Sequence, residues 1–299
     1  MEYNTVTNNM ARIPQTLAMI QSLRDRYYRV LPGKESLIKM ITEAEIPEHV
    51  YNSNAIENST LTLEETEKIL LQIDLDRFVS EREIFEAKNL ARVVAYTETK
   101  AKEAEISLEI MLLLHKMLIG NIREDIAGRF RQDNEWVRVG THIGASPKDV
   151  KRLLTDMLTE YHASASEHIV KRVARFHLTF ENIHPFIDGN GRIGRALNNY
   201  AFIREGYVPV NIAFVNRARY YDAFKEFEDS GQTAVMEETI GRALTASYHK
   251  RLAYLEGKRI ITLADYAKET KQSHPNLINK AHRQTIPAFT EKGVWKIGV

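Results

Sequence analysis

Cysteine is absent from this chain of 299 residues, so disulfide bonds and thiolate chemistry are excluded. An excess of charge of one sign is absent too, because 41 Lys and Arg stand against 40 Asp and Glu for a formal net charge of +1. That balance gives no reason to expect the chain as a whole to bind nucleic acid. The motif Gly-x-x-x-x-Gly-Lys-Ser/Thr is also missing, which excludes a Walker-type phosphate loop.

Long hydrophobic runs are missing as well. The strongest one, Ile110–Leu114, is followed by His115 and is far too short to cross a bilayer, so we expect no membrane partner. The polar residues 1–9 lack the apolar segment of a signal peptide. These features together predict a cytoplasmic protein.

Helical periodicity is what the chain has in abundance. With 43% hydrophobic and 27% charged residues, it can bury a sizeable core. Apolar residues recur every three or four positions and predict helices over residues 15–28, 62–73, 80–102, 107–118, 148–161, 167–180 and 233–255. Pro14, Pro32 and Pro47 punctuate the N-terminal third. The predicted fold class is all-α, with one small β element.

The most informative stretch is His184–Arg195, which reads His-Pro-Phe-Ile-Asp-Gly-Asn-Gly-Arg-Ile-Gly-Arg. A helix is expected to begin near Asn190, because glycines surround this residue and helical spacing follows it. Arg192 and Arg195 then lie near the positive end of that helix, where acidic side chains are normally preferred. Such cations repel one another unless an anion lies among them, and the free N–H groups of a helix start also bind anions. A polyphosphate satisfies all of these groups.

Two further side chains of this stretch suit phosphate chemistry. Asp188 could bind magnesium, which prefers one or two carboxylates together with substrate phosphates. His184 could take a proton from a nucleophile, since an ordinary imidazole pKa of about 6.5 leaves the ring largely neutral at pH 7.

The same stretch matches the signature of the Fic family, His-x-Phe-x-Asp/Glu-Gly-Asn-Gly-Arg-x-x-Arg, at every fixed position, and His177–Ile183 resembles the helix before that motif. The resemblance implies a helical Fic core and transfer of AMP from ATP to a Ser, Thr or Tyr hydroxyl of a protein, with self-modification left open. It also implies a division of labour. His184 is the general base, Asp188 binds Mg²⁺, and the phosphates are held by Gly189, Asn190, Gly191, Arg192 and Arg195.

Upstream, Ser53–Asn58 resembles the family's inhibitory motif Ser/Thr-x-x-x-Glu-Gly/Asn, on a helix expected over about 44–57. Ser53 and Glu57 are four residues apart and share one helical face. By the resemblance, Glu57 pairs with Arg195 and takes the cation meant for the γ-phosphate. In some relatives the same glutamate is thought to support removal of AMP, so a bifunctional enzyme stays open.

Residues 128–140 are similar to the family's β-hairpin flap, which holds an extended segment of the target by strand pairing. Arg131, Trp136 and Val137 are the flap residues expected to contact the target. Trp136 could instead be a core residue or stabilise the hairpin. Further along, residues 216–224 resemble a family segment near the nucleotide, although Tyr220 and Tyr221 could equally serve helix packing.

The C-terminal residues differ in character from the rest. Residues 258–299 hold eight Lys and Arg against three Asp and Glu, a net charge of +5. Short helices over 262–269 and 273–283 and two strands over 286–297 resemble the winged-helix appendages of some Fic cores, which bind DNA or protein or form dimers. The predicted domains are a helical region 1–105, a catalytic core 106–256 and a winged-helix-like domain 258–299.

Two functions therefore compete. The first is an autoinhibited protein adenylyltransferase that uses ATP and Mg²⁺. The second is a non-enzymatic regulator with a degenerate nucleotide site, which acts through DNA or a partner bound at the C-terminal domain; a homodimer stays open in either case. An intact set of motif residues favours the enzyme, because a decayed site has no need of them: His184, Asp188, Asn190, Arg192 and Arg195.

Overall fold

The structure is a computed structural model that describes residues 13–299. Residues 1–12, in which we expected no signal peptide, lie outside the described residues. The chain forms two compact units. The larger one comprises Ile46–Tyr207 and Ile212–Met236, and the smaller one comprises the described residues up to Glu45 with Val208–Asn211 and Glu237–Val299. This division does not coincide with the predicted boundaries at 105 and 257, because two long helices contribute residues to both units.

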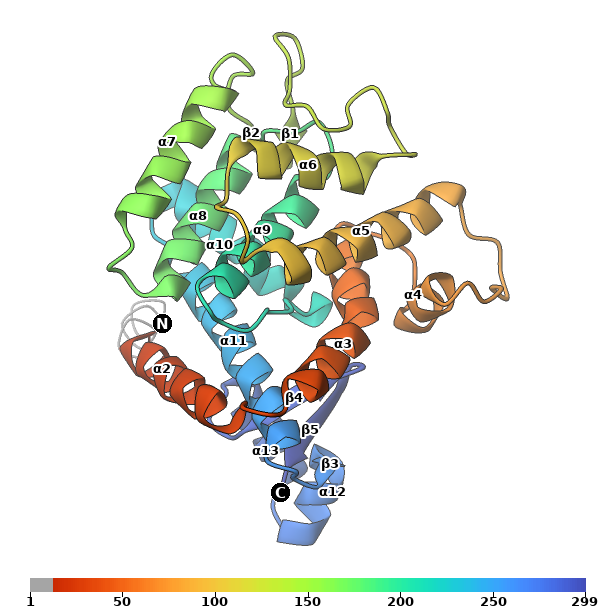
Figure 1. The fold of residues 1–299 in the computed structure, drawn as a ribbon, viewed down its shortest axis with the longest axis vertical. Helices are drawn as coiled ribbons and strands as arrows, with labels where there is room; N and C mark the ends of the chain where they lie inside the picture. The colour runs from red at the N-terminus through yellow and green to blue at the C-terminus, as the bar shows by residue number, and fades with distance from the viewer. Residues whose placement is uncertain (1–12) are drawn as a thin grey trace. The chain divides into compact units, whose positions relative to one another are not determined.

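The larger unit is helical, as predicted (Figure 1). Its elements are α4 (Leu63–Leu70), α5 (Glu81–Lys100), α6 (Leu108–Ile119), β1 (Arg138–Val139), β2 (His142–Ile143), α7 (Val150–Ala163), α8 (Ile169–Ile183), α9 (Asn190–Arg204), the 3-10 turn η1 (Phe214–Asn216) and α10 (Arg217–Ser230), together with the last turns of α3 (Glu35–Ile56). Helix α9 packs against α5, α6 and α8. Its Ile193, Leu197 and Phe202 are fully buried, and burying each such side chain contributes about 1.5–3 kcal/mol. The start of α9 is thereby fixed inside the unit.

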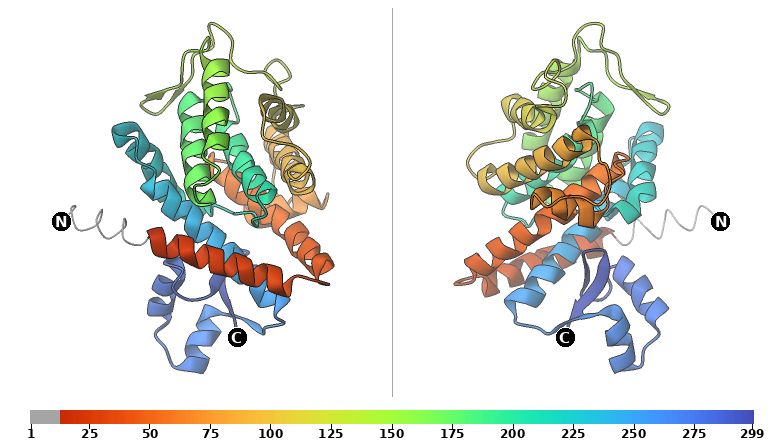
Figure 2. Two further views of the ribbon diagram at one scale, coloured as in Figure 1. Left: turned by 60° about the vertical axis from the view of Figure 1, so that its left-hand side comes forward. Right: turned by 90° about the vertical axis from the view of Figure 1, so that its right-hand side faces the viewer.

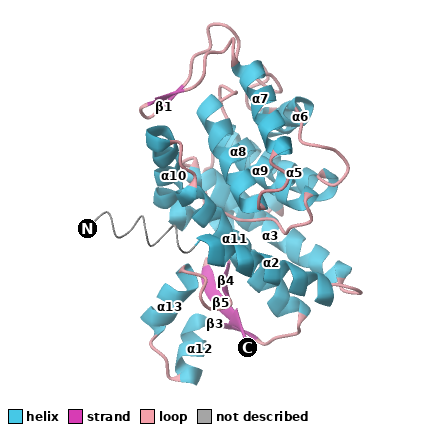
Figure 3. Ribbon diagram, turned by 90° about the vertical axis from the view of Figure 1, so that its left-hand side faces the viewer, coloured by secondary structure: helices cyan, strands magenta, loops and turns pink. Residues whose placement is uncertain are grey.

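The smaller unit contains α2 (Ile13–Val30), the first part of α3, most of α11 (Ala234–Leu255) and a small sheet with two helices. Strand β5 (Val294–Gly298) lies between β3 (Ile260–Thr262) and β4 (Ala288–Glu291) and is antiparallel to both (Figures 2 and 3). Between β3 and β4 come α12 (Leu263–Thr270) and α13 (His274–His282). The expected helices and strands are present in the expected order, and the winged-helix interpretation of them stays a prediction.

Helix starts follow the local chemistry of the sequence. The hydroxyls of Thr62, Ser80, Ser107 and Thr262 each accept a hydrogen bond from the backbone N–H three residues later, which satisfies one of the free donors of a helix start. Thr62 and Glu65 complete a capping box. Within residues 13–299, no helix is both long and apolar enough to cross a membrane.

Pro47 does not end a helix. Pro47 lies inside α3, which continues to Ile56. A proline within a helix removes one backbone hydrogen bond and costs about 3 kcal/mol or more. Ile41, Val50 and Ile56 of the same helix are nearly or fully buried, and their burial offsets that cost. The helix therefore reaches Ser53 without a break.

Candidate active site

The loop that leads into α9 is held rigidly. Gly189 has a φ of 86°, a left-handed conformation that favours glycine, and a Cβ there would lie 2.9 Å from Leu118. The Asn190 side chain accepts from the N–H of Phe186 at 2.8 Å and donates to its carbonyl at 2.9 Å. Phe186 is fully buried and stacks on His115, with ring centroids 3.8 Å apart. The side chain of Asn190 thus shapes the loop, and the helix start offers its backbone N–H groups.

His184 ends α8 in a left-handed conformation, with a φ of 53°. Its Nδ1 lies 3.2 Å from the carbonyl oxygen of Glu181. That oxygen can only accept, so Nδ1 carries the hydrogen and Nε2 has the free lone pair. Burial, helped by the charge of Arg131, lowers the pKa of His184 to about 4 despite the hydrogen bond to Glu181. The ring is therefore neutral at pH 7 and able to accept a proton at Nε2.

The Arg195 guanidinium contacts Ser53 and Glu57 of the upstream motif, as the resemblance implied, and also Tyr220. It donates to the hydroxyl of Ser53 at 2.9 Å, to the carbonyl of Ser53 at 2.8 Å, to Glu57 Oε1 at 2.9 Å and to the hydroxyl of Tyr220 at 3.2 Å. Burial opposes the charge of Arg195, but Tyr220 and Glu57 together raise its pKa. A Cβ at Gly191 would clash with Glu57 Oε1. The Glu57 carboxylate thus lies against the first turn of α9, where an anion is favoured.

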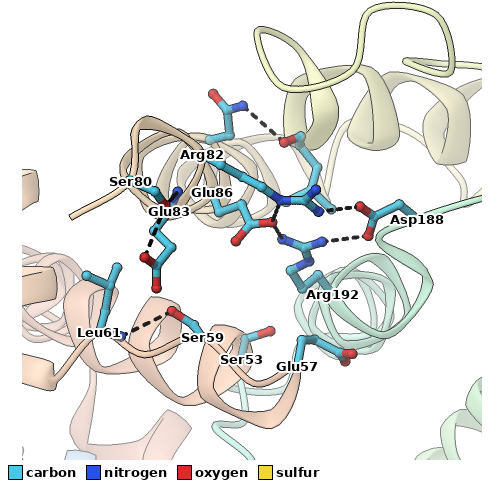
Figure 4. Close-up of polar contacts among 12 residues, drawn as sticks. Ser53, Glu57, Ser59, Leu61, Ser80, Arg82, Glu83, Glu86, Asp188 and Arg192 are labelled. Atoms are coloured by element: carbon cyan, nitrogen blue, oxygen red, sulfur yellow. Dashed lines mark hydrogen bonds and ion pairs between the residues drawn. The ribbon is translucent and has the colours of Figure 1, made fainter.

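Asp188 and Arg192 lie beside two residues of α5 that the sequence did not point to. Asp188 accepts from Arg192 at 2.9 Å and from Arg82 at 2.8 Å (Figure 4). Glu86 pairs with both arginines, at 3.2 Å to Arg192 and 3.1 Å to Arg82. The sequence contains only a local signal for these residues, namely that Arg82 and Glu86 are spaced for an i,i+4 ion pair. The contacts of Arg82 with Asp188 and of Glu86 with Arg192 depend on tertiary packing.

Three polar side chains behind Arg195 were also missed or left open: Tyr220, His177 and Glu181. Tyr220 bonds to His177 Nε2 at 2.7 Å, and both side chains are buried. Burial, with Arg195 nearby, lowers the pKa of His177 to about 3. Burial and the charge of Glu57 raise the pKa of Glu181 to about 8. At pH 7 the side chains of His177 and Glu181 are therefore neutral, and the formal charges closest to them are those of Arg195 and Glu57.

The flap differs from its predicted form. We expected a hairpin over 128–140, whereas the strand pair lies at Arg138–Ile143. The first part of the expected hairpin is occupied by a tight turn, in which the Glu135 carboxylate accepts from the backbone N–H of Gln132 at 2.6 Å. Arg131 is buried and donates to the carbonyls of residues 135, 145, 183 and 184. It ties the flap to the turn that holds His184. Trp136 is 60% exposed, which excludes the alternative of a core residue, and Val137 is partly buried.

The described residues offer little for a metal besides Asp188, because none of them form a cluster of three or more His, Cys, Asp or Glu side chains. Magnesium binds proteins through one or two carboxylates and otherwise through water and substrate phosphates. A single carboxylate beside the start of α9, where backbone N–H groups favour anions, fits that pattern. Asp188 therefore fits Mg²⁺ that arrives together with a polyphosphate, and does not form a protein-only metal site.

Comparisons with known proteins agree with this geometry. Residues 105–202 match the model of the Fic/DOC family. Protein adenylyltransferase Fic of Drosophila willistoni is 31% identical over 232 residues, which cover 72% of this chain and 46% of that protein. The chain thus spans about half the length of the curated relatives it matches.

Two solved structures are similar to this one. Fic-1 of C. elegans aligns with a TM-score of 0.73 and 26% identity over 85% of this chain and 76% of that one. A Fic domain containing signaling protein of Bacteroides thetaiotaomicron also has a TM-score of 0.73, at 22% identity, over 81% of this chain and 98% of that one. The second likeness shows the fold alone.

Proposed function

This chain is a member of the Fic/DOC family through its residues 105–202, and on that premise we propose that it transfers AMP from ATP to a Ser, Thr or Tyr hydroxyl of a protein. One observation carries the proposal. A neutral imidazole, with its lone pair at Nε2, ends the helix before a rigid loop, and the helix that follows this loop begins with N–H groups and arginines that suit anions. The relatives named protein adenylyltransferase support the same activity.

The proposed reaction uses each group of the site once. The target hydroxyl gives its proton to His184 Nε2 while its oxygen forms a bond to the α-phosphorus of ATP. The bond from that phosphorus to the β-phosphate oxygen breaks, and pyrophosphate leaves. Charge develops on the phosphate oxygens, so the first N–H groups of α9 and the guanidiniums of Arg192 and Arg195 stabilise the transition state. Magnesium, held by Asp188 and the phosphates, would neutralise part of the same charge.

We also propose that Glu57 inhibits this reaction within the chain. Its carboxylate takes an N–H of Arg195 and lies against Gly191, where an outer phosphate of productively bound ATP would lie. ATP would then bind in a pose that turns the α-phosphorus away from His184. Removal of AMP, the reverse activity that the resemblance left open, is assayed by incubating an AMP-modified target with the same variants.

The alternative of a regulator that binds DNA receives less support. In the smaller unit, several basic side chains are paired with acids of the same unit, namely Arg259 with Glu269, Lys268 with Asp265 and Lys296 with Glu291. Such pairing leaves less positive charge for phosphates than the net charge of +5 implies. DNA binding, dimerisation and a cytoplasmic location stay predictions.

The test compares ATP labelled at the α-phosphate with ATP labelled at the γ-phosphate. Each is incubated with Mg²⁺, a cell lysate as a source of targets, and the Glu57→Gly variant. Relative to the lysate alone, the proposal expects the variant to add the α-label but no γ-label to protein, and expects the added α-label to be lost when His184→Ala is introduced. Added γ-label would indicate phosphorylation instead, and no added label of either kind would favour the regulator.

A further inference from the structure

Four charged side chains form a closed ring at the edge of the candidate active site (Figure 4). Going round the ring, Arg82 contacts Asp188 at 2.8 Å, Asp188 contacts Arg192 at 2.9 Å, Arg192 contacts Glu86 at 3.2 Å, and Glu86 contacts Arg82 at 3.1 Å. The charges alternate in sign around the ring. Arg82 and Glu86 belong to α5 and lie outside the residues that match the family model.

The position of Arg82 is unfavourable by local chemistry alone. It lies in the first turn of α5, just after the N-cap Ser80, where the helix end is positive. The other charged residues of that turn, Glu81 and Glu83, follow the ordinary preference for acids. A cation at this place needs an anionic partner, and Asp188 provides one. The pair with Asp188 therefore offsets the repulsion that the helix end exerts on Arg82.

The ring occupies the carboxylate that we assign to magnesium. Oδ1 of Asp188 accepts from Arg192 and Oδ2 accepts from Arg82. A divalent cation at either oxygen would lie next to two guanidinium groups, and like charges at such distances repel. Metal binding at Asp188 therefore requires that one of the arginines move away.

The two arginines differ in their freedom to move. The Arg192 side chain is 5% exposed and is enclosed by the packing of α9, whereas that of Arg82 is 55% exposed. Arg82 also has a second partner on its own helix, Glu86, whose side chain is 13% exposed. Arg82 can thus leave Asp188 and still keep an ion pair.

We propose that Arg82 is a positioning residue that competes with the metal for Asp188: it holds this carboxylate while no nucleotide is bound and withdraws to Glu86 when the metal and its phosphates take Asp188. The inference rests on the proposed function, because it takes Asp188 as the metal ligand. It assigns to α5 a control on metal binding that is separate from the contact of Glu57 with Arg195.

The experiment measures metal binding rather than activity. Mn²⁺, which is visible by electron paramagnetic resonance, is titrated into the full chain in the presence of α,β-methylene ATP, whose α–β linkage cannot be cleaved. All samples carry Glu57→Gly, so that the Glu57 carboxylate does not occupy Arg195 in any of them. The variants added to this parent are Arg82→Ala, Arg82→Gln, Arg82→Lys, Asp188→Ala, and Arg92→Ala as a control that removes an exposed arginine of the same helix.

Arg82→Ala and Arg82→Gln should bind Mn²⁺ about two- to five-fold more tightly than the parent, since an exposed ion pair is worth up to about 1 kcal/mol. Arg82→Lys should stay within about two-fold of the parent, because it keeps the charge. Arg92→Ala should leave the affinity unchanged. The gain should shrink as salt is raised, because salt screens exposed pairs.

Unchanged affinity in both Arg82→Ala and Arg82→Gln would overturn the inference. Weaker binding in them would also overturn it, because Arg82 would then hold the phosphates rather than compete with the metal. Asp188→Ala distinguishes a failure of the Arg82 inference from a failure of the proposed metal site. If it abolishes Mn²⁺ binding while the Arg82 variants change nothing, the inference alone fails. If it has no effect, the metal assignment of the proposed function fails as well.

Discussion

Replacing Glu57 by glycine should release the site. Arg195 is 8% exposed and Glu57 is 35% exposed, and they are joined by one charged hydrogen bond of 2.9 Å. A hydrogen bond to a charged group is worth about 1.5–3 kcal/mol. Because water reaches the Glu57 carboxylate, we take the lower end, about 1.5 kcal/mol, which corresponds to about a tenfold change in an equilibrium constant. Glu57→Gly should therefore transfer AMP about tenfold faster than the wild type at low ATP.

The assay is the initial rate of α-label transfer to protein over a range of ATP concentrations. The gain should be largest at low ATP and smaller at saturation, because ATP competes with Glu57 for Arg195. Glu57→Gln, which keeps the shape without the charge, should fall between the wild type and Glu57→Gly. Ser53→Ala should gain only about two-fold, since the carbonyl contact of Ser53 with Arg195 remains. An equal or lower rate in Glu57→Gly would refute the reasoning.

Three further predictions concern the base, the loop and the buried histidines. His184→Ala should lower transfer by about 10²–10⁴-fold while equilibrium binding of ATP stays within about two-fold; a large loss of binding would contradict its role as a base. Asn190→Ala should lower the free energy of unfolding in urea by about 2 kcal/mol, because two hydrogen bonds to Phe186 are lost, and an unchanged midpoint would count against this. Lowering the pH from 7 to 5 should lower the melting temperature, because histidines of the unfolded chain bind protons below about pH 6.5 whereas four histidines of the folded chain do not. In the folded chain the pKa values of these four are lowered to about 3 or 4: His115, His177, His184 and His249. An unchanged melting temperature would contradict those lowered pKa values.

The helical fold and the centre of the candidate site could be predicted because their signals are local. Apolar spacing and caps such as Ser107 indicate where helices begin. The motif from His184 to Arg195 brings its groups together within one loop and one turn of helix, so few tertiary contacts are needed to assemble it. Glu57 was predicted to contact Arg195 by resemblance, not by any pattern in the residues between them.

The remainder depends on packing that the residue pattern does not contain. Arg82 and Glu86 reach Asp188 because α5 packs against α9, and Tyr220 reaches Arg195 from α10. Pro47 is tolerated within α3 because burial along that helix outweighs a local penalty. Arg131 was assigned to the target-binding flap on sequence alone, whereas its guanidinium lies under the flap and donates to four backbone carbonyls. A buried arginine of this kind has no sequence signature.

The central claim is that the start of α9 directs the α-phosphorus of ATP toward His184. The most direct test is intact-protein mass spectrometry of the chain, with and without an added protein target, after incubation with ATP and Mg²⁺. The account predicts a gain of one AMP on the chain or its target with Glu57→Gly, and no gain when His184→Ala is added. A gain that persists without His184, or none with Glu57→Gly under any condition, would contradict it.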